Sequence, residues 1–202
     1  MENRGKPFDD QEEAILWRGS LAGDAQLFEN LVDQTYDLLF QYGCKFCRDR
    51  DLVKDCIQDV FLEVWEKRQL LNANIPPRPY FLASLRRRLH RVVQYNRMST
   101  FGDYDKIELD FESEFSVEQQ FIQLESDQRL ATELSYWLNE LPKRQKEAVY
   151  LRFFHDLSRD EIAEIMDIHP QSVSNLLQTA FKWLKIHWKV GLMLCLRFWY
   201  QG

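Results

Sequence analysis

The stretch from Leu157 to Ala180 carries start and turn signals that predict two helices joined by a tight turn. Ser158 and Glu161 have the spacing of a capping box, which satisfies backbone donors at a helix start. Asp167 tolerates the left-handed conformation that a turn needs, and Pro170 suits the first position of a second helix. This second helix would bury one apolar face: Val173, Leu176, Leu177, Ala180, Phe181 and Leu184. The pattern is a helix-turn-helix, whose second helix presents its outward face to the major groove of DNA.

The outward face of the second helix is polar and almost uncharged. It carries Gln171, Ser174, Asn175, Gln178 and Lys182. No charged residue occurs from Pro170 to Phe181, so an arginine cannot read guanine here, whereas glutamine and asparagine side chains can read adenine edges.

Charge is segregated along the chain, although the net charge of −6 argues against a general DNA-coating protein. Residues 78–97 hold six arginines and no acid, and residues 103–127 hold nine acids and one lysine. The basic block has a helical apolar stripe, with arginines and other side chains largely outside it: Tyr80, Ser84, Arg87, Arg88 and Arg91. Arginines beside aromatics suit single-stranded or melted nucleic acid. The alternative is a solvated basic helix that pairs with the acidic N-terminal half.

The stretch Asp49–Arg68 predicts an amphipathic helix with an acidic outer stripe. That stripe contains Asp55, Gln58, Asp59, Leu62, Glu63 and Glu66. An apolar Leu62 within it is typical of a docking face for a basic helical partner, while the alternative is a stripe that only keeps the helix in solvent.

These patterns predict an all-α chain of two small helical domains. Residues 9–97 form the first, and 128–188 form the second, which contains the helix-turn-helix. An acidic linker over 98–127 is either a plain tether or a strand that imitates nucleic acid in a basic channel. The apolar tail 189–202 either caps the second core or forms a patch that an inhibitory partner covers.

Several other classes of protein are disfavoured by the sequence. There is no secretory signal and no apolar run near the roughly 20 residues of a membrane span, so a cytoplasmic location is expected. Cys44 and Cys47 form a lone CxxC in a helical pattern without further ligands, which favours small buried side chains over a zinc site. No cofactor, metal site or small-molecule substrate is indicated, and no glycine-rich loop, nucleophile elbow or clustered acid–base set suggests an enzyme.

The order of these features resembles the extracytoplasmic-function (ECF) group of the sigma-70 family, from about Gln11 to Trp188. Four motifs carry the resemblance: DLVKDCIQDVFLEVWEKR (51–68), YFLASLRRRL (80–89), LPKRQKEAVYLRF (141–153) and LSRDEIAEIMDIHPQSVSNLL (157–177). The resemblance implies a DNA-binding transcription initiation factor, a non-catalytic subunit that joins bacterial RNA polymerase core and directs it to promoters. It also implies that an anti-sigma partner regulates it.

The resemblance further implies roles for individual residues. The clamp helices of core polymerase would be contacted by Asp55, Gln58, Asp59, Leu62 and Glu63, and the flap of core polymerase is a further implied partner. The −10 promoter element would be melted and read by Tyr80, Arg86, Arg87, Arg88 and Arg91. The −35 element would be bound by Lys143, Arg144, Arg152, Gln171, Ser174, Asn175, Gln178 and Lys182.

Two departures from the family stand out. Tyr80 and Arg87 occupy positions where the family usually has tryptophan and asparagine. The recognition helix also lacks the lysine or arginine that the family often has there. Binding of the −35 element is therefore expected either to be weak or to rely on Lys143, Arg144, Lys182 and Lys185. The alternative function is a sigma-like protein that binds core polymerase or an anti-sigma partner without reading upstream DNA.

Overall fold

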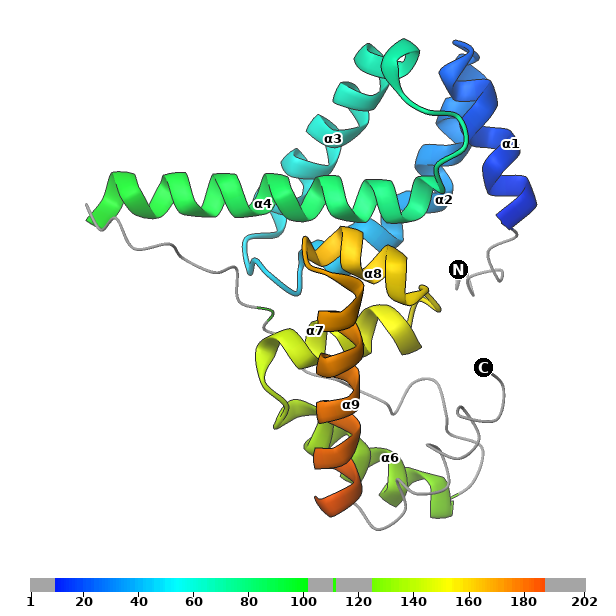
Figure 1. Cartoon of the computed structure of the whole chain (residues 1–202). Coiled ribbons are helices and arrows are strands. Elements are labelled where there is room, and N and C mark those ends of the chain that lie inside the picture. Colours follow the sequence, from blue (N-terminus) through cyan, green and yellow to red (C-terminus); the bar gives the residue numbers. More distant parts are fainter. Residues whose placement is uncertain (1–9, 102–110, 112–124, 188–202) are drawn as a thin grey trace. The chain divides into compact units, whose positions relative to one another are not determined.

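The computed structural model describes residues 10–101, 111 and 125–187, and these residues form helices and connecting turns without strands (Figure 1). The chain divides into two compact units, residues 1–109 and 110–202. The predicted all-α fold is confirmed.

The first unit contains α1 (Asp10–Leu21), α2 (Ala25–Gly43), α3 (Arg50–Lys67), the short 3₁₀ helix η1 (Arg68–Leu70) and α4 (Pro77–Phe101). Two aspartates cap helices of this unit. The side chain of Asp24 accepts hydrogen bonds from backbone N–H groups in the first turn of α2, and the side chain of Asp49 does the same for α3. The four α-helices pack around a cluster of aromatic side chains. The ring centroid of Phe81 lies 5.8 Å from that of Trp17 and 5.3 Å from that of Phe61.

A buried ion pair joins α1 to α4, two helices that are far apart in the sequence of this unit. Glu13 in α1 lies 3.4 Å from Arg78 in the first turn of α4, and both side chains are almost inaccessible to solvent. Removing one partner of such a pair leaves a buried charge, which costs more than the intact pair contributes. This contact therefore fixes α1 against the start of α4.

The prolines after the acidic helix do not all lie in the break between this helix and the basic helix. Pro77 begins α4 and Pro79 lies in its first turn, where a missing backbone N–H costs no helical hydrogen bond. The break itself is the short connection between η1 and Pro77. From there α4 runs as one helix to Phe101, beyond the expected domain end at residue 97.

The CxxC sequence also differs from expectation. The last residue of α2 is Gly43, so Cys44 caps that helix and the turn after it carries the half-buried Cys47. Burial raises the pKa of the Cys44 thiol and raises that of Cys56 to about 11, which disfavours the thiolate forms that bind metals. Within the described residues, no group of three or more His, Cys, Asp or Glu side chains could hold a metal ion. Cys195 lies outside these residues.

The second unit contains α6 (Glu125–Asn139), α7 (Lys143–Phe153), α8 (Arg159–Met166) and α9 (Pro170–His187). Its core is built from apolar side chains of all four helices: Leu138, Leu151, Ile162, Ile165, Val173 and Leu184. At one end, Trp137 of α6 contacts Trp183 and His187 of α9, with ring centroids 5.5 and 5.2 Å away.

Phe111, in the middle of the expected linker, belongs to this second core. Only 1% of its surface is exposed, and its ring centroid lies 5.4 Å from that of Tyr150 in α7. Helices α4 and α6 also extend into the range 98–127 from its two ends. The expected linker is therefore not a single uninterrupted tether. The apolar tail 189–202 lies outside the described residues.

Candidate nucleic-acid interface

The helix-turn-helix is formed by α8 and α9, and its local signals act as the sequence predicts. The backbone N–H of Glu161 donates to Ser158 Oγ at 3.3 Å, and the N–H of Ser158 donates to the Glu161 carboxylate at 2.7 Å. Asp167 has the left-handed conformation (φ 54°, ψ 53°) that ends α8. Pro170 is the first residue of α9. The capping box, the turn and the second helix start are all confirmed.

The outward face of α9 carries exposed polar side chains, two of which hydrogen-bond to each other. Gln171, Asn175, Gln178 and Lys182 are exposed, and the amide of Gln171 donates to Asn175 Oδ1 at 3.2 Å. Ser174 is half-buried, and its hydroxyl lies 3.4 Å from the carbonyl oxygen of Pro170. Four of the five residues predicted to read DNA bases are therefore accessible, whereas the hydroxyl of Ser174 contacts the backbone of its own helix.

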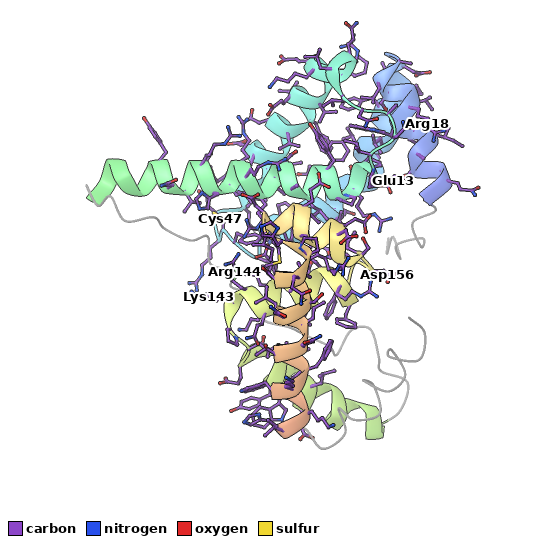
Figure 2. The ribbon with its side chains drawn as sticks, viewed as in Figure 1. Glu13, Arg18, Cys47, Lys143, Arg144 and Asp156 are labelled. Carbon is purple, nitrogen blue, oxygen red and sulfur yellow. The ribbon has the colours of Figure 1, made fainter. Side chains whose placement is uncertain are left out.

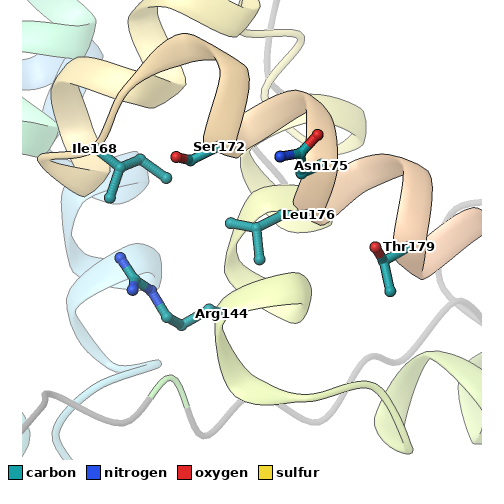
Figure 3. Close-up of a pocket in the computed structure, with 6 residues that line it drawn as sticks. All are labelled: Arg144, Ile168, Ser172, Asn175, Leu176 and Thr179. Atoms are coloured by element: carbon teal, nitrogen blue, oxygen red, sulfur yellow. The ribbon is translucent and has the colours of Figure 1, made fainter.

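A surface pocket of about 310 Å³ adjoins this face (Figure 3). It lies between the start of α7 and α9, and its lining combines one cation with polar and apolar side chains: Arg144, Ile168, Ser172, Asn175, Leu176 and Thr179. Leu176 was expected in the core, but it is half-buried and lines this pocket. The surface beside the predicted readers is thus partly apolar.

The three cations predicted in α7 have different surroundings. Lys143 and Arg144 are exposed in the first turn of α7 (Figure 2), where both can approach a phosphate. Arg152 is half-buried, and its guanidinium donates to the carbonyl oxygen of Leu157 at 2.9 Å. This bond holds the connection into α8, so Arg152 has a structural task that sequence reasoning missed.

Of the residues of α4 that were predicted to bind nucleic acid, some are exposed and others are half-buried against side chains of the same unit. Arg87 and Arg91 are exposed. Tyr80 is half-buried, with its ring centroid 5.7 Å from that of Trp17. The guanidinium of Arg86 lies over the ring of Phe46, 5.9 Å from its centroid.

Arg88 binds the acidic helix rather than projecting alone from α4. Its guanidinium lies 2.5 Å from Asp59 Oδ2 and 3.9 Å from Glu63 Oε2, both in α3. The absence of an acid within four residues of Arg88 excluded only a local ion pair, and its partners are distant in sequence. Arg88 therefore fits the alternative interpretation, in which the basic helix pairs with the acidic N-terminal half.

The acidic face of α3 is exposed where the sequence predicts a docking surface. Asp55 and Gln58 are exposed, and Leu62 has 58% of its surface accessible. Glu63 accepts from Lys67 at 2.6 Å. The hydrogen bond from Lys67, together with the charges of Lys67, Arg88 and Arg91, lowers the pKa of Glu63.

Comparisons with known proteins agree with this arrangement. The family model Sigma-70 region 2 matches residues 31–97, which span most of α2 to α4. The model Sigma-70, region 4 matches residues 131–184, which include the helix-turn-helix. Together the two matched segments make up more than half of the chain, which therefore belongs to the sigma-70 family.

One curated relative is the RNA polymerase sigma factor SigV of Bacillus subtilis (strain 168), which is 44% identical over 55 residues. That match covers 27% of this chain, and the chain spans about a third (33%) of the relative's length.

Two solved structures share the fold. CnrH in complex with the cytosolic domain of CnrY has a TM-score of 0.56 and 15% identity, over 87% of this chain and 96% of that chain. The sigma factor RpoE in complex with the anti-sigma factor NepR from Bartonella quintana has a TM-score of 0.55 and 16% identity, over 81% of this chain and 97% of that chain.

Proposed function

We propose that this protein is a sigma factor that binds bacterial RNA polymerase core and directs it to promoters, with no reaction of its own. The observation that carries the proposal is the pair of sigma-70 regions in their family order, each folded as a separate unit. A helix-turn-helix alone would suit many regulators, whereas an acidic docking helix and an arginine-rich helix before it suit a polymerase subunit.

The docking surface for core polymerase is the outer face of α3. We assign it to Asp55, Gln58, Asp59, Leu62 and Glu63. Exposed carboxylates around an exposed leucine suit a basic helix that also buries an apolar side chain. Complementary charge would speed the encounter, and Leu62 would supply apolar area at its centre.

The surface for the −10 element is the exposed side of α4. Arg87 and Arg91 are four residues apart, so they lie on the same face and can hold successive phosphates of a melted strand. Tyr80 and Arg86 are half-buried against aromatic rings, so they would contact DNA only with their exposed edges.

The −35 element would be held by the second unit. Lys143 and Arg144 suit phosphates, and Gln171, Asn175 and Gln178 suit adenine edges. Lys182 adds one further cation on α9. This surface has few cations, so we expect a shallow dependence of upstream DNA binding on salt.

Location and regulation follow from the same proposal. A polymerase subunit works in the cytoplasm, and no helix within the described ranges has both the length and the apolar character to cross a membrane. One solved relative is a sigma factor held by an anti-sigma factor, which supports the proposal that an anti-sigma partner controls this chain too.

Two substitutions in α4 test promoter opening. Open-complex formation by purified core polymerase is measured on a library of promoter fragments, for the wild type and for Arg87→Ala with Arg91→Ala. We expect selective opening by the wild type and a strong loss in the double variant. Arg18→Ala is the control, because Arg18 is an exposed arginine of α1 outside every proposed surface. Equal opening by the double variant and the wild type would refute the assignment.

A matched pair of leucines tests docking. Leu62→Asp should weaken binding to core polymerase, whereas Leu70→Asp should not, although Leu70 is 84% exposed in the same unit. Equal effects of the two substitutions would contradict a docking surface on α3.

The alternative function is a sigma-like protein that does not read upstream DNA. The observation that favours it is the uncharged stretch of α9 from Pro170 to Phe181. Binding of upstream duplex fragments measured against salt separates the two functions. A sigma factor loses salt dependence when Lys143 and Arg144 become alanine, by about 0.9 in slope for each phosphate contact. A decoy binds core polymerase and opens no promoter.

A further inference from the structure

We propose that Arg88 is shared between two partners: Asp59 and Glu63 hold it in the unbound protein, and a basic helix docking on these carboxylates releases it to a nucleic-acid phosphate. The inference rests on the proposed function, because it needs a docking partner on α3 and nucleic acid on α4. It assigns to one ion pair the link between these two surfaces.

The ion pair lies on the face of α3 that is proposed to bind core polymerase. Asp59 and Glu63 are one helical turn apart on the outer side of α3, next to the exposed Leu62. The same two carboxylates bind the guanidinium of Arg88, at 2.5 and 3.9 Å. A basic partner on this face would therefore compete with Arg88 for both carboxylates.

Arg88 lies on α4 next to the arginines that are proposed to bind nucleic acid. Arg91 lies four positions after Arg87 and three after Arg88, so its side chain neighbours both of them on the helix surface. Arg87 and Arg91 are exposed. A released Arg88 would complete a cluster of three guanidinium groups, which suits the closely spaced phosphates of a nucleic-acid strand.

The ion pair between Arg88 and the two carboxylates is only moderately stable. The side chains of Arg88, Asp59 and Glu63 are 29%, 46% and 43% exposed, so solvent screens their attraction. Glu63 is divided between Arg88 and Lys67. The Nε atom of Arg88 is buried and has no hydrogen-bond partner within the described residues. A pair of this kind changes an equilibrium by about fivefold at most, so a partner can displace it.

The coupling must act in both directions. If docking on α3 releases Arg88 for nucleic acid, then nucleic acid bound to Arg88 must favour docking by the same factor. One residue would then make polymerase binding and strand binding mutually supportive, without a large conformational change.

The test removes the two carboxylates that hold Arg88 by mutation, in the absence of core polymerase. Asp59→Asn with Glu63→Gln removes both carboxylates, and binding of a short fluorescein-labelled single-stranded oligonucleotide of random sequence is followed by fluorescence anisotropy at several salt concentrations. We expect affinity to rise by up to about fivefold. The slope of log K against log salt should steepen by about 0.7, the value of one added phosphate contact on a single strand. Adding Arg88→Ala should restore the slope of the wild type.

The control removes the same charge elsewhere in the unit. Asp33→Asn with Asp37→Asn takes two exposed carboxylates from α2 and leaves the ion pair intact. Equal slopes in this control and in the Asp59 and Glu63 variant would overturn the inference, and so would the absence of oligonucleotide binding in every variant. Circular dichroism establishes that each variant keeps its helix content.

Binding to core polymerase separates this inference from the proposed function. Wild type that fails to bind core polymerase would refute the function itself. If wild type binds, Arg88→Ala should bind equally well or up to about fivefold more tightly, because its carboxylates no longer have to leave an internal partner. Weaker binding of Arg88→Ala would instead show that Arg88 only supports the fold of the docking surface, which also overturns the inference.

Discussion

Replacing Phe111 by alanine should destabilise the second unit by about 3 kcal/mol. Phe111 is 1% exposed and packs on Tyr150, which is itself buried. Truncation of a buried phenylalanine costs about 3 to 5 kcal/mol, the sum of lost apolar transfer and the cavity left behind. We take the lower end because Phe111 lies outside the helices, where the backbone can move to fill part of the cavity.

Hydrogen exchange in the full-length protein measures this effect for one unit at a time. Peptides from α7 report the opening of the helix that Phe111 covers. A loss of 3 kcal/mol corresponds to about a hundredfold faster exchange of the best-protected amides, since each 1.4 kcal/mol is tenfold. Peptides from α3, in the other unit, should keep the exchange rates of the wild type.

Tyr136→Ala provides the control for this measurement. Tyr136 is an aromatic residue of the same unit with 57% of its surface exposed, so its loss should change stability by no more than about 0.5 kcal/mol. If Phe111→Ala behaves like Tyr136→Ala, then Phe111 does not form part of the second core, and its segment is a tether of the kind that the sequence suggested.

Three further predictions concern single contacts. Arg152→Ala removes the bond to the Leu157 carbonyl and should lower the stability of the second unit by about 1 kcal/mol in thermal unfolding, whereas unchanged unfolding would mean that solvent replaces this bond. Ser158→Ala removes half of the capping box and should cost about 1 kcal/mol in the same measurement, with Ser158→Asn as a control that retains a cap. Because the folded protein lowers the pKa of Glu63, chiefly through Lys67, its contribution to stability is present above the ordinary pKa of 4.5 and is lost as pH falls through the folded value. Lys67→Met should reduce the loss of stability on acidification below pH 4.5, and the effect should be small because both side chains are exposed; an unchanged pH profile would contradict this account.

The sequence predicts those parts of this protein that depend on near neighbours in the chain. The capping box of Ser158, the left-handed Asp167 and the start of α9 at Pro170 each depend on residues within one helical turn. The exposed Leu62 was also predictable, because the helical period of α3 is regular enough to assign its two faces. Such features are read from spacing alone.

Contacts between distant residues could not be predicted in this way. Arg88 is separated from Asp59 by 29 positions, so neither residue shows a pattern that identifies its partner. Phe111 is an aromatic residue in an acidic stretch without helical periodicity, and only the tertiary structure reveals that it is buried. Arg152 illustrates the same limit, because a cation near a DNA-binding motif looks equally suited to phosphate and to a backbone carbonyl.

The burial of Phe111 divides the expected linker into two connections of different kinds. Phe111 and the start of α6 both belong to the second unit, so the chain that joins them begins and ends on one folded body, whereas the chain before Phe111 leads from the first unit to the second. Lengthening a closed loop costs conformational entropy, about 0.6 kcal/mol for each doubling of its length. An insertion after Phe111 would therefore reduce the stability of the second unit, and the same insertion before Phe111 would leave that stability unchanged. Evolution can adjust the spacing between the two units only on the N-terminal side of this residue without a cost in folding.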